Sequence, residues 1–314
     1  MTDRAEQHLT AFSSIVELIG GSPAAEAARG SLGRASGAAS PVLIVVEPGL
    51  DGTAVARAVH DRSARRAGPF MVVECTTADV AHLAEQIFGT VAGAGTLMLA
   101  NLQELPAPLQ TRLARVLRDG QIAIDGSDAI LPFDARLMAS VSGSLDEAVQ
   151  DGTLRRELIA RFHQRIELPP LRQRPADIPM LIGCIVAESA VAAQLPVPTF
   201  SRESLTLLAA LPWRRNLDEL REVLDLLVRA SVGGVVRLED VLDHIPVERM
   251  TSGDGAATSL REARLSFERH YIATVLNRHR GRMEDAARSL GIQRTNLYRK
   301  VRQLGIGLQR VHQK

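Results

Sequence analysis

The sequence has few cysteines, no low-complexity segment and no long apolar run. Its two cysteines, Cys75 and Cys184, lie far apart and match no metal-ligand spacing, so we expect reduced, buried thiols and no metal site. No apolar stretch approaches the roughly 20 residues that cross a bilayer, and the N-terminus has no apolar run like that of a signal peptide. These absences predict a cytoplasmic protein with no membrane partner.

What the sequence does have is an uneven distribution of charge. The formal net charge of the 314 residues is +1, but residues 260–314 contain 13 Lys and Arg against 4 Asp and Glu. The first 259 residues contain 24 basic and 32 acidic residues. A small basic module on an acidic body is typical of a chain in which one domain meets a polyanion. A solvated basic tail is the alternative, but it leaves the helical periodicity of this segment unexplained.

Up to about residue 170, apolar runs alternate with amphipathic segments, which predicts an α/β fold with a mostly parallel, helix-covered sheet. Expected strands cover 42–49, 69–75, 95–102 and 135–143, and expected helices cover 1–19, 53–66 and 106–120, the last ended by Gly120. The segment 20–41 receives no element. From Pro175 onward strands cease, and helices are expected over 178–195, 201–211 and 216–231.

The basic C-terminal module has the pattern of a helix-turn-helix. An amphipathic helix over 260–279 ends at Gly281, and two short helices follow, joined at Gly291. Leu297 and Val301 anchor the second of these to the core. Its other face displays polar side chains, which we expect to bind double-stranded DNA: Gln293, Arg294, Thr295, Asn296, Arg299, Lys300 and Arg302. We expect Arg294 to pair with guanine and Asn296 with adenine, and Arg299, Lys300 and Arg302 to contact phosphates.

Two resemblances extend these predictions. The motif AARSLGI followed by R-x-x-L-Y-R-K resembles the Fis-type helix-turn-helix that ends many bacterial enhancer-binding proteins. That resemblance implies an all-α DNA-binding domain and a homodimer formed through the C-terminal helices. Several blocks in the order of the family, among them GTLMLANLQELPAPLQTRLARVLRDGQ and LPPLRQRPADIPML, resemble the AAA+ domain of sigma-54-dependent transcriptional activators.

The resemblances imply five parts of the chain. We expect an N-terminal helical extension at 1–16, a degenerate AAA+ α/β subdomain at 17–170, a helical lid subdomain at 171–247, a linker at 248–259 and a Fis-type helix-turn-helix domain at 260–314. The family also has a GAFTGA loop that touches sigma-54. Here EQIFGTVAGAGTLML runs almost directly into the next strand, so that loop is absent.

The positions that align with the nucleotide site have changed. A phosphate loop needs glycines and a lysine, but its window reads VEPGLDGT, in which Val46 and Asp51 replace the glycines, Gly52 replaces the lysine, and Thr53 alone fits. The remaining replacements are at the metal and base positions and at the two sensors: Ala100, Asn101, Ser142 and Asp218. Acid in a phosphate cradle repels phosphate. We therefore expect no catalytic residues, no enzyme activity and no cofactor.

Arg155 and Arg161 align with the arginine fingers of the family. The main hypothesis is a sequence-specific, nucleoid-associated transcriptional regulator that acts without ATP hydrolysis and independently of sigma-54, with RNA polymerase as a further candidate partner. The arginines leave open a second hypothesis, a co-regulator subunit that joins a higher oligomer with an active paralogue. A third is a sensor of a nucleotide second messenger, for which Arg214 and Arg215 are candidates.

Overall fold

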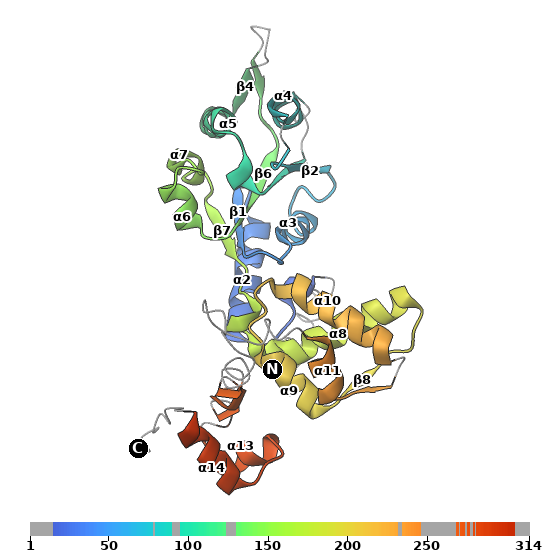
Figure 1. Ribbon diagram of the computed structural model, residues 1–314. Coiled ribbons are helices and arrows are strands. Elements are labelled where there is room, and N and C mark those ends of the chain that lie inside the picture. Colours follow the sequence, from blue (N-terminus) through green and yellow to red (C-terminus); the bar gives the residue numbers. More distant parts are fainter. Residues whose placement is uncertain are drawn as a thin grey trace. The chain divides into compact units, whose positions relative to one another are not determined.

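The computed structural model describes residues 15–77, 79–89, 95–123, 130–231, 234–245 and 281–304, together with 268–269, 271–273, 275–276 and 279. The chain divides into two compact units, drawn in Figure 1. The first consists of Met1–Arg174 and Arg215–Leu217, and the second of Pro175–Arg214 and Asp218–Lys314. Each unit is described by itself.

The first unit is built on a five-stranded parallel sheet. Its strands lie in the order β2-β3-β6-β1-β7. Their bounds are Val42–Val46 for β1, Phe70–Glu74 for β2, Thr96–Ala100 for β3, Arg136–Ser142 for β6 and Gln164–Glu167 for β7. All four neighbouring pairs run parallel. The predicted α/β fold with a parallel sheet is therefore confirmed.

Helices before and between the strands cover the sheet. They are α2 (Pro23–Gly37), α3 (Gly52–Asp61), α4 (Val80–Ala84), the π-helical turn η2 (Glu85–Gly89), α5 (Ala107–Asp119), α6 (Leu145–Gln150) and α7 (Arg156–Ile159). Leu97 and Leu99 of β3 pack with Leu109 and Leu113 of α5 in one core. Met98 lies between them on the strand and is also buried, so β3 is covered on both faces. A short hairpin, β4 (Gln121–Ala123) with β5 (Ile130–Pro132), follows α5.

The second unit contains a helical part and the helix-turn-helix. The helical part consists of α8 (Ile178–Ala193), α9 (Arg202–Ala210), α10 (Asn216–Ser231) from Asp218 onward, and α11 (Leu238–His244). Two short strands, β8 (Thr199–Phe200) and β9 (Val235–Val236), pair within it. Pro175–Ala193 is long and apolar enough, by length and composition alone, to cross a membrane, so the expectation that no apolar stretch approaches that length was wrong. Ile178, Leu181 and Ile185 of this helix are buried, and α8 contacts α9.

Two sequence-based assignments in the first unit were wrong. Within the described part of the expected helix 1–19, residues 16–18 form a single 3-10 turn, Val16–Leu18. Residues 1–14 lie outside the described residues. The segment left without an element contains α2, a helix that begins with Ser22 as its N-cap and Pro23 in its first turn. The glycines and serines of α2 lower its helix propensity, so the sequence pattern does not predict a helix there. In the structure, a buried face of alanines with Leu32 packs α2 against the rest of the unit. Strands also do not cease after Pro175, because β8 and β9 pair there.

Candidate nucleic-acid interface and nucleotide loop

The helix-turn-helix is formed by α13 (Met283–Ser289) and α14 (Arg294–Gln303). Gly291 between them has a φ of +65°, a left-handed conformation that glycine adopts without strain. The side chain of Leu297 is fully buried and that of Val301 is buried in the same core, together with Ala286 and Ala287 of α13. One face of α14 therefore packs on the module, and the opposite face is left to solvent.

The exposed face of α14 carries most of the predicted DNA-binding residues. Those classed as exposed are Gln293, Arg294, Thr295, Asn296, Arg299 and Arg302. Lys300 differs, because its side chain is 36% exposed and its ammonium forms an ion pair with Glu268. Arg269, the residue after Glu268, donates through Nε to the carbonyl of Leu304 at 2.7 Å. Lys300 thus connects α14 to the helical segment before the turn, in addition to any role at phosphates.

Sequence reasoning missed Tyr298, which lies one turn after Arg294 on α14. Its ring is 45% exposed, although tyrosine is one of the larger apolar surfaces a helix can carry. The guanidinium carbon of Arg294 lies 5.6 Å from the centre of this ring. A side-chain hydrogen bond from Arg294 to Tyr298 raises the pKa of Arg294. The spacing of four residues, which places two helical side chains one above the other, was the available signal.

The loop between β1 and α3 holds the altered phosphate-loop window. Asp51 is the N-cap of α3, and its Oδ1 accepts hydrogen bonds from the backbone N–H groups of Thr53 at 2.8 Å and Ala54 at 3.0 Å. Gly52 is buried, and a Cβ there would lie 2.8 Å from Cβ of Ser140. Val46 is buried at the end of β1. The first amides of α3, which can bind an anion, are thus engaged by the chain's own carboxylate.

The same loop is held by residues far along the chain within the first unit. Glu47 forms a two-pronged ion pair with Arg172, with N–O distances of 2.5 and 2.6 Å, and this pairing lowers the pKa of Glu47. Asn216 donates through Nδ2 to the carbonyl of Pro48 at 3.0 Å and accepts from the N–H of Leu171 at 2.9 Å. These contacts, which the sequence did not reveal, hold the loop to Arg172 and Asn216 of the same unit.

The residues that replace the metal and base positions form local contacts. Ala100 is buried at the end of β3. Asn101 follows in a left-handed conformation, and its Nδ2 donates to Oε1 of Glu74 at 2.9 Å. Its backbone N–H donates to Oγ of Ser140 at 3.2 Å. Among the other predicted positions, the N–H of Ser142 donates to Gln103, and Asp218 is exposed in the first turn of α10.

The arginines that align with arginine fingers differ in exposure. Arg155 is the N-cap residue of α7, and its backbone N–H donates to Oε1 of Gln110 at 2.9 Å, while its side chain is exposed. Arg161 is half-buried, and its Nε has no hydrogen-bond partner. Within the described ranges neither side chain is in an ion pair. Arg214 and Arg215, the candidates for second-messenger binding, are exposed.

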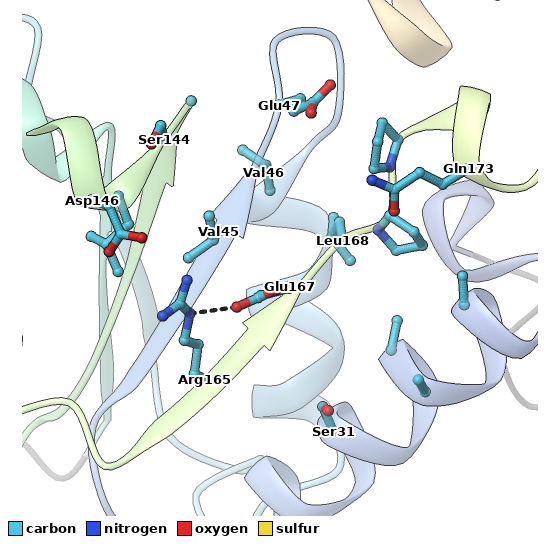
Figure 2. Close-up of a pocket in the computed structure, with 17 residues that line it drawn as sticks. Ser31, Val45, Val46, Glu47, Ser144, Asp146, Arg165, Glu167, Leu168 and Gln173 are labelled. Carbon is cyan, nitrogen blue, oxygen red and sulfur yellow. Dashed lines mark ion pairs between the residues drawn. The ribbon is translucent and has the colours of Figure 1, made fainter.

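A cavity of about 590 Å³ opens beside the carboxyl ends of β1 and β7, against α2 (Figure 2). Arg165 and Glu167 of β7 form an ion pair at 2.8 Å along its wall. Glu47, which also lines it, is already paired with Arg172. Arg165, Glu167 and Glu47, which line the cavity, are therefore already engaged in ion pairs. Over the ranges that the structure describes, no group of three or more His, Cys, Asp or Glu is placed to hold a metal ion.

A parallel α/β unit, followed by a helical part and a helix-turn-helix with a cationic outer face, is the architecture of an AAA+-like protein with a helix-turn-helix module. Comparison with protein families agrees. Residues 18–94 and 91–167 match the sigma-54 interaction domain, residues 172–258 the AAA+ ATPase lid domain, and residues 265–304 the bacterial regulatory protein, Fis family.

Individual relatives give the family. The chain is 30% identical over 330 residues to the DNA-binding transcriptional regulator NtrC of Salmonella typhimurium, with 92% of this chain and 70% of NtrC covered. It is 29% identical over 336 residues to NtrC of Proteus hauseri, with 94% and 71% covered. The chain belongs to the family of NtrC-like sigma-54 enhancer-binding regulators and is homologous to DNA-binding transcriptional regulators.

Solved structures agree with the fold and correct one prediction. NtrX from Brucella abortus in complex with ATP superimposes with a TM-score of 0.75 at 27% identity, covering 97% of this chain and 73% of NtrX. The NtrX complex with ADP gives 0.72 at 26% identity, with the same coverage. These structures show an AAA+ relative that binds nucleotide. The prediction that the chain is not an enzyme is therefore wrong, because the chain belongs to a family of AAA+ proteins that bind nucleotide. That prediction counted replaced side chains, whereas the nucleotide-binding fold, with α3 directed from the end of β1, is retained.

Proposed function

We propose that the chain is a sequence-specific regulator that occupies promoter DNA through α14 and acts independently of sigma-54. The observation that carries the proposal is the exposed polar and cationic face of α14, opposite a buried face anchored by Leu297. A helix of this kind, presented by a glycine turn, fits the major groove with its N-terminal side chains at base edges. Occupying or bending a site requires no nucleotide turnover.

Each exposed residue has an assigned role. Arg294, in the first turn of α14, is assigned to guanine, because its planar guanidinium matches the acceptor pair of that base. Asn296 is assigned to adenine by the same reasoning. Arg299 and Arg302 are assigned to phosphates, which set the register of the protein on DNA without reading sequence. Two such modules in a homodimer, formed through the C-terminal helices, would read a site with two-fold symmetry.

Independence from sigma-54 is supported by the segment between η2 and β3. The match to the sigma-54 interaction domain falls into two pieces that meet at residues 91–94. That is the place where the sequence lacks the GAFTGA loop. Without the contact loop, the route left to the chain is direct action at promoters of another polymerase form.

DNA binding by the full-length chain tests this function. Duplexes selected from a random pool by the wild-type protein would be measured by fluorescence anisotropy against an unselected duplex. We expect the selected duplex to bind at least about 1,000-fold more tightly, within the range of specific regulators. Genome-wide mapping would then place bound sites at promoters of other sigma factors. Equal affinity for both duplexes, or sites confined to sigma-54 promoters, would contradict the proposal.

We also propose that Asp51 alters the nucleotide site by competing with phosphate for the amides of Thr53 and Ala54. The residues here do not fit the phosphate cradle of the family, since the loop supplies a carboxylate where the cradle needs a lysine. Asp51→Ser keeps an N-cap acceptor and removes the charge, so it should raise the affinity for ATP.

The chain offers a matched control for that substitution. Asp79 caps α4 with the same pair of hydrogen bonds, from Ala81 and His82, each at 3.0 Å. Asp79→Ser therefore removes the same charge from an equivalent cap elsewhere and should leave the affinity unchanged. Calorimetric titration of ATP, with and without Mg²⁺, measures both variants. An affinity that does not respond to Asp51→Ser would show that the two do not compete.

A second candidate function is a co-regulator subunit in a mixed ring, favoured by the exposed side chain of Arg155, which forms no ion pair with any residue that the structure describes. Such an arginine can reach the nucleotide of a neighbouring active subunit and stabilise charge there. Co-purification with an active paralogue, and a fall in the ATPase activity of the mixture on Arg155→Ala, would support it. Arg156→Ala, at the next exposed position, is the control. Absence of any mixed assembly would refute it.

A further inference from the structure

We propose that Tyr298 is a positioning residue for Arg294 and thereby sets how strictly the protein reads one guanine. The inference rests on the proposed function, in which α14 lies in the major groove. It concerns a residue pair on the recognition helix that the sequence pattern did not single out. Two observations carry it: the exposed ring of Tyr298 and the placement of the Arg294 guanidinium over that ring.

The first step is the freedom of Arg294. An exposed arginine on a helix samples many rotamers, and it must be fixed in one of them before both of its donors can meet the N7 and O6 atoms of guanine. No ion pair of Arg294 is found within the described residues. The aromatic ring one turn later is therefore the principal feature on α14 that restricts the guanidinium before DNA arrives.

The second step is the chemistry of the pair. An arginine guanidinium stacks on the face of an aromatic ring through its charge and its planar shape, and the N–H groups of Arg294 that are not bonded to Tyr298 stay free to donate. At 5.6 Å from the ring centre, the guanidinium of Arg294 is within the range of this interaction. The contact is modest in water and strengthens when the groove excludes solvent. Pre-ordering lowers the entropy lost on binding and favours the one geometry that fits guanine.

The third step is why the ring is left exposed. Tyr298 is 45% exposed, whereas the preceding residue, Leu297, is fully buried. The tyrosine thus contributes little to the core of the module. A tyrosine kept on the solvent side at the spacing of one turn from Arg294 is explained by a role on the DNA-binding face. Its loss should change recognition while leaving the fold intact.

The experiment uses the full-length chain and duplex DNA of the sequence selected by the wild-type protein. Each G·C pair of that sequence is replaced in turn by A·T, and affinities are measured for the selected, substituted and unselected duplexes. We expect one guanine at which wild type discriminates by about 10-fold or more and Arg294→Ala does not. At that guanine, Tyr298→Ala should retain at most about 3-fold discrimination, and Tyr298→Phe, which keeps the ring, should stay within about 2-fold of wild type.

A structural effect has a different signature. Loss of the fold would lower the affinity for selected and unselected duplexes together, whereas loss of positioning leaves the unselected duplex unaffected. Tyr298→Gln is a second ring-less variant with a good helix propensity, for use if alanine disturbs α14. A double-mutant cycle between Arg294→Ala and Tyr298→Ala measures their coupling at the selected duplex.

Each outcome decides one claim. A wild-type protein that prefers no sequence contradicts the proposed function itself. A sequence preference in which Tyr298→Ala and Tyr298→Gln discriminate that guanine as well as wild type contradicts the inference and leaves the function standing. The inference also fails if both variants weaken binding to the unselected duplex as much as to the selected one, or if Tyr298→Phe behaves like Tyr298→Ala.

Discussion

At the scale of single residues, polar side chains that follow β1 and β3 bond to other groups of the first unit. Glu47 binds Arg172, Asp51 caps α3, and Asn101 donates to Glu74. Each contact satisfies a polar group that the loop leaves near the carboxyl ends of the strands. These polar side chains at the carboxyl ends of the strands are thus bonded to other groups of the same chain.

The Glu47–Arg172 pair predicts a stability change in acid. Because the pKa of Glu47 is lowered in the folded protein, the pair stabilises the fold above the usual pKa of 4.5, and this contribution is lost as pH falls through the lowered pKa. Arg172 is 48% exposed, so solvent screening limits the effect to less than about 1 kcal/mol. Urea unfolding at neutral pH and below pH 4.5 should show a smaller acid loss for Glu47→Gln than for wild type. Glu167→Gln, which breaks a more exposed pair, is the control. Equal acid losses in wild type and Glu47→Gln would contradict it.

At the scale of elements, two segments pack closely where the loop after β1 meets residues 215–217. Gly49 has a φ of +83°, and a Cβ built there would lie 1.8 Å from the carbonyl oxygen of Arg215. The loop and the start of α10 therefore approach each other through backbone, with Asn216 bonded to Pro48 beside them. Only glycine fits this contact without moving one of the two segments.

We therefore expect Gly49→Ala to destabilise the first unit by about 2 kcal/mol or more, from both the clash and the left-handed φ. Gly33→Ala is the matched control. Gly33 is exposed in α2 with nothing within 4 Å of an added Cβ. Its replacement should stabilise by about 0.5–1 kcal/mol, because alanine is the better helix former. Urea titrations followed by far-UV circular dichroism measure both. Equal stabilities for the two variants would mean that the loop and residues 215–217 separate freely.

The helix-turn-helix allows a second prediction at this scale. Leu297 is fully buried in the module core, so Leu297→Ala should cost about 2–5 kcal/mol and abolish DNA binding. The single tryptophan, Trp213, lies outside the module, so its fluorescence transition in urea should not change. Tyr298→Ala, at the neighbouring exposed position, should keep the module folded. A shift of the Trp213 transition by Leu297→Ala would show that the module and the region around Trp213 unfold together.

The sequence predicted some elements and missed others for identifiable reasons. Apolar runs such as residues 97–100 are visible because a strand covered on both faces is almost wholly apolar. The turn at Gly291 and the two faces of α14 follow from glycine chemistry and helical spacing. By contrast, α2 depends on alanines packed by the rest of the unit. The pair of Glu47 and Arg172 joins residues 125 positions apart, which no local pattern encodes.

At the scale of the whole molecule, the division of charge sets how the chain meets DNA. The acidic first 259 residues and the basic residues 260–314 confine favourable contact with a polyanion to the C-terminal module. A phosphate contact releases counterions, so the logarithm of affinity falls with the logarithm of salt concentration by about 0.9 per contact. The slope therefore counts phosphate contacts for the whole assembly.

This count also tests the proposed homodimer. Arg299→Ala removes one phosphate contact from each module, so the slope should become shallower by about 1 if one module binds and by about 2 if two modules bind. Arg302→Ala should act in the same way. Arg165→Ala, which removes a cation from β7, should leave the slope unchanged. Anisotropy titrations of the full-length chain over a range of potassium chloride concentrations give these slopes. A decrease of about 2 for Arg299→Ala supports recognition by a homodimer. A decrease of about 1 means that a single module accounts for binding, and no decrease means that Arg299 lies off the DNA.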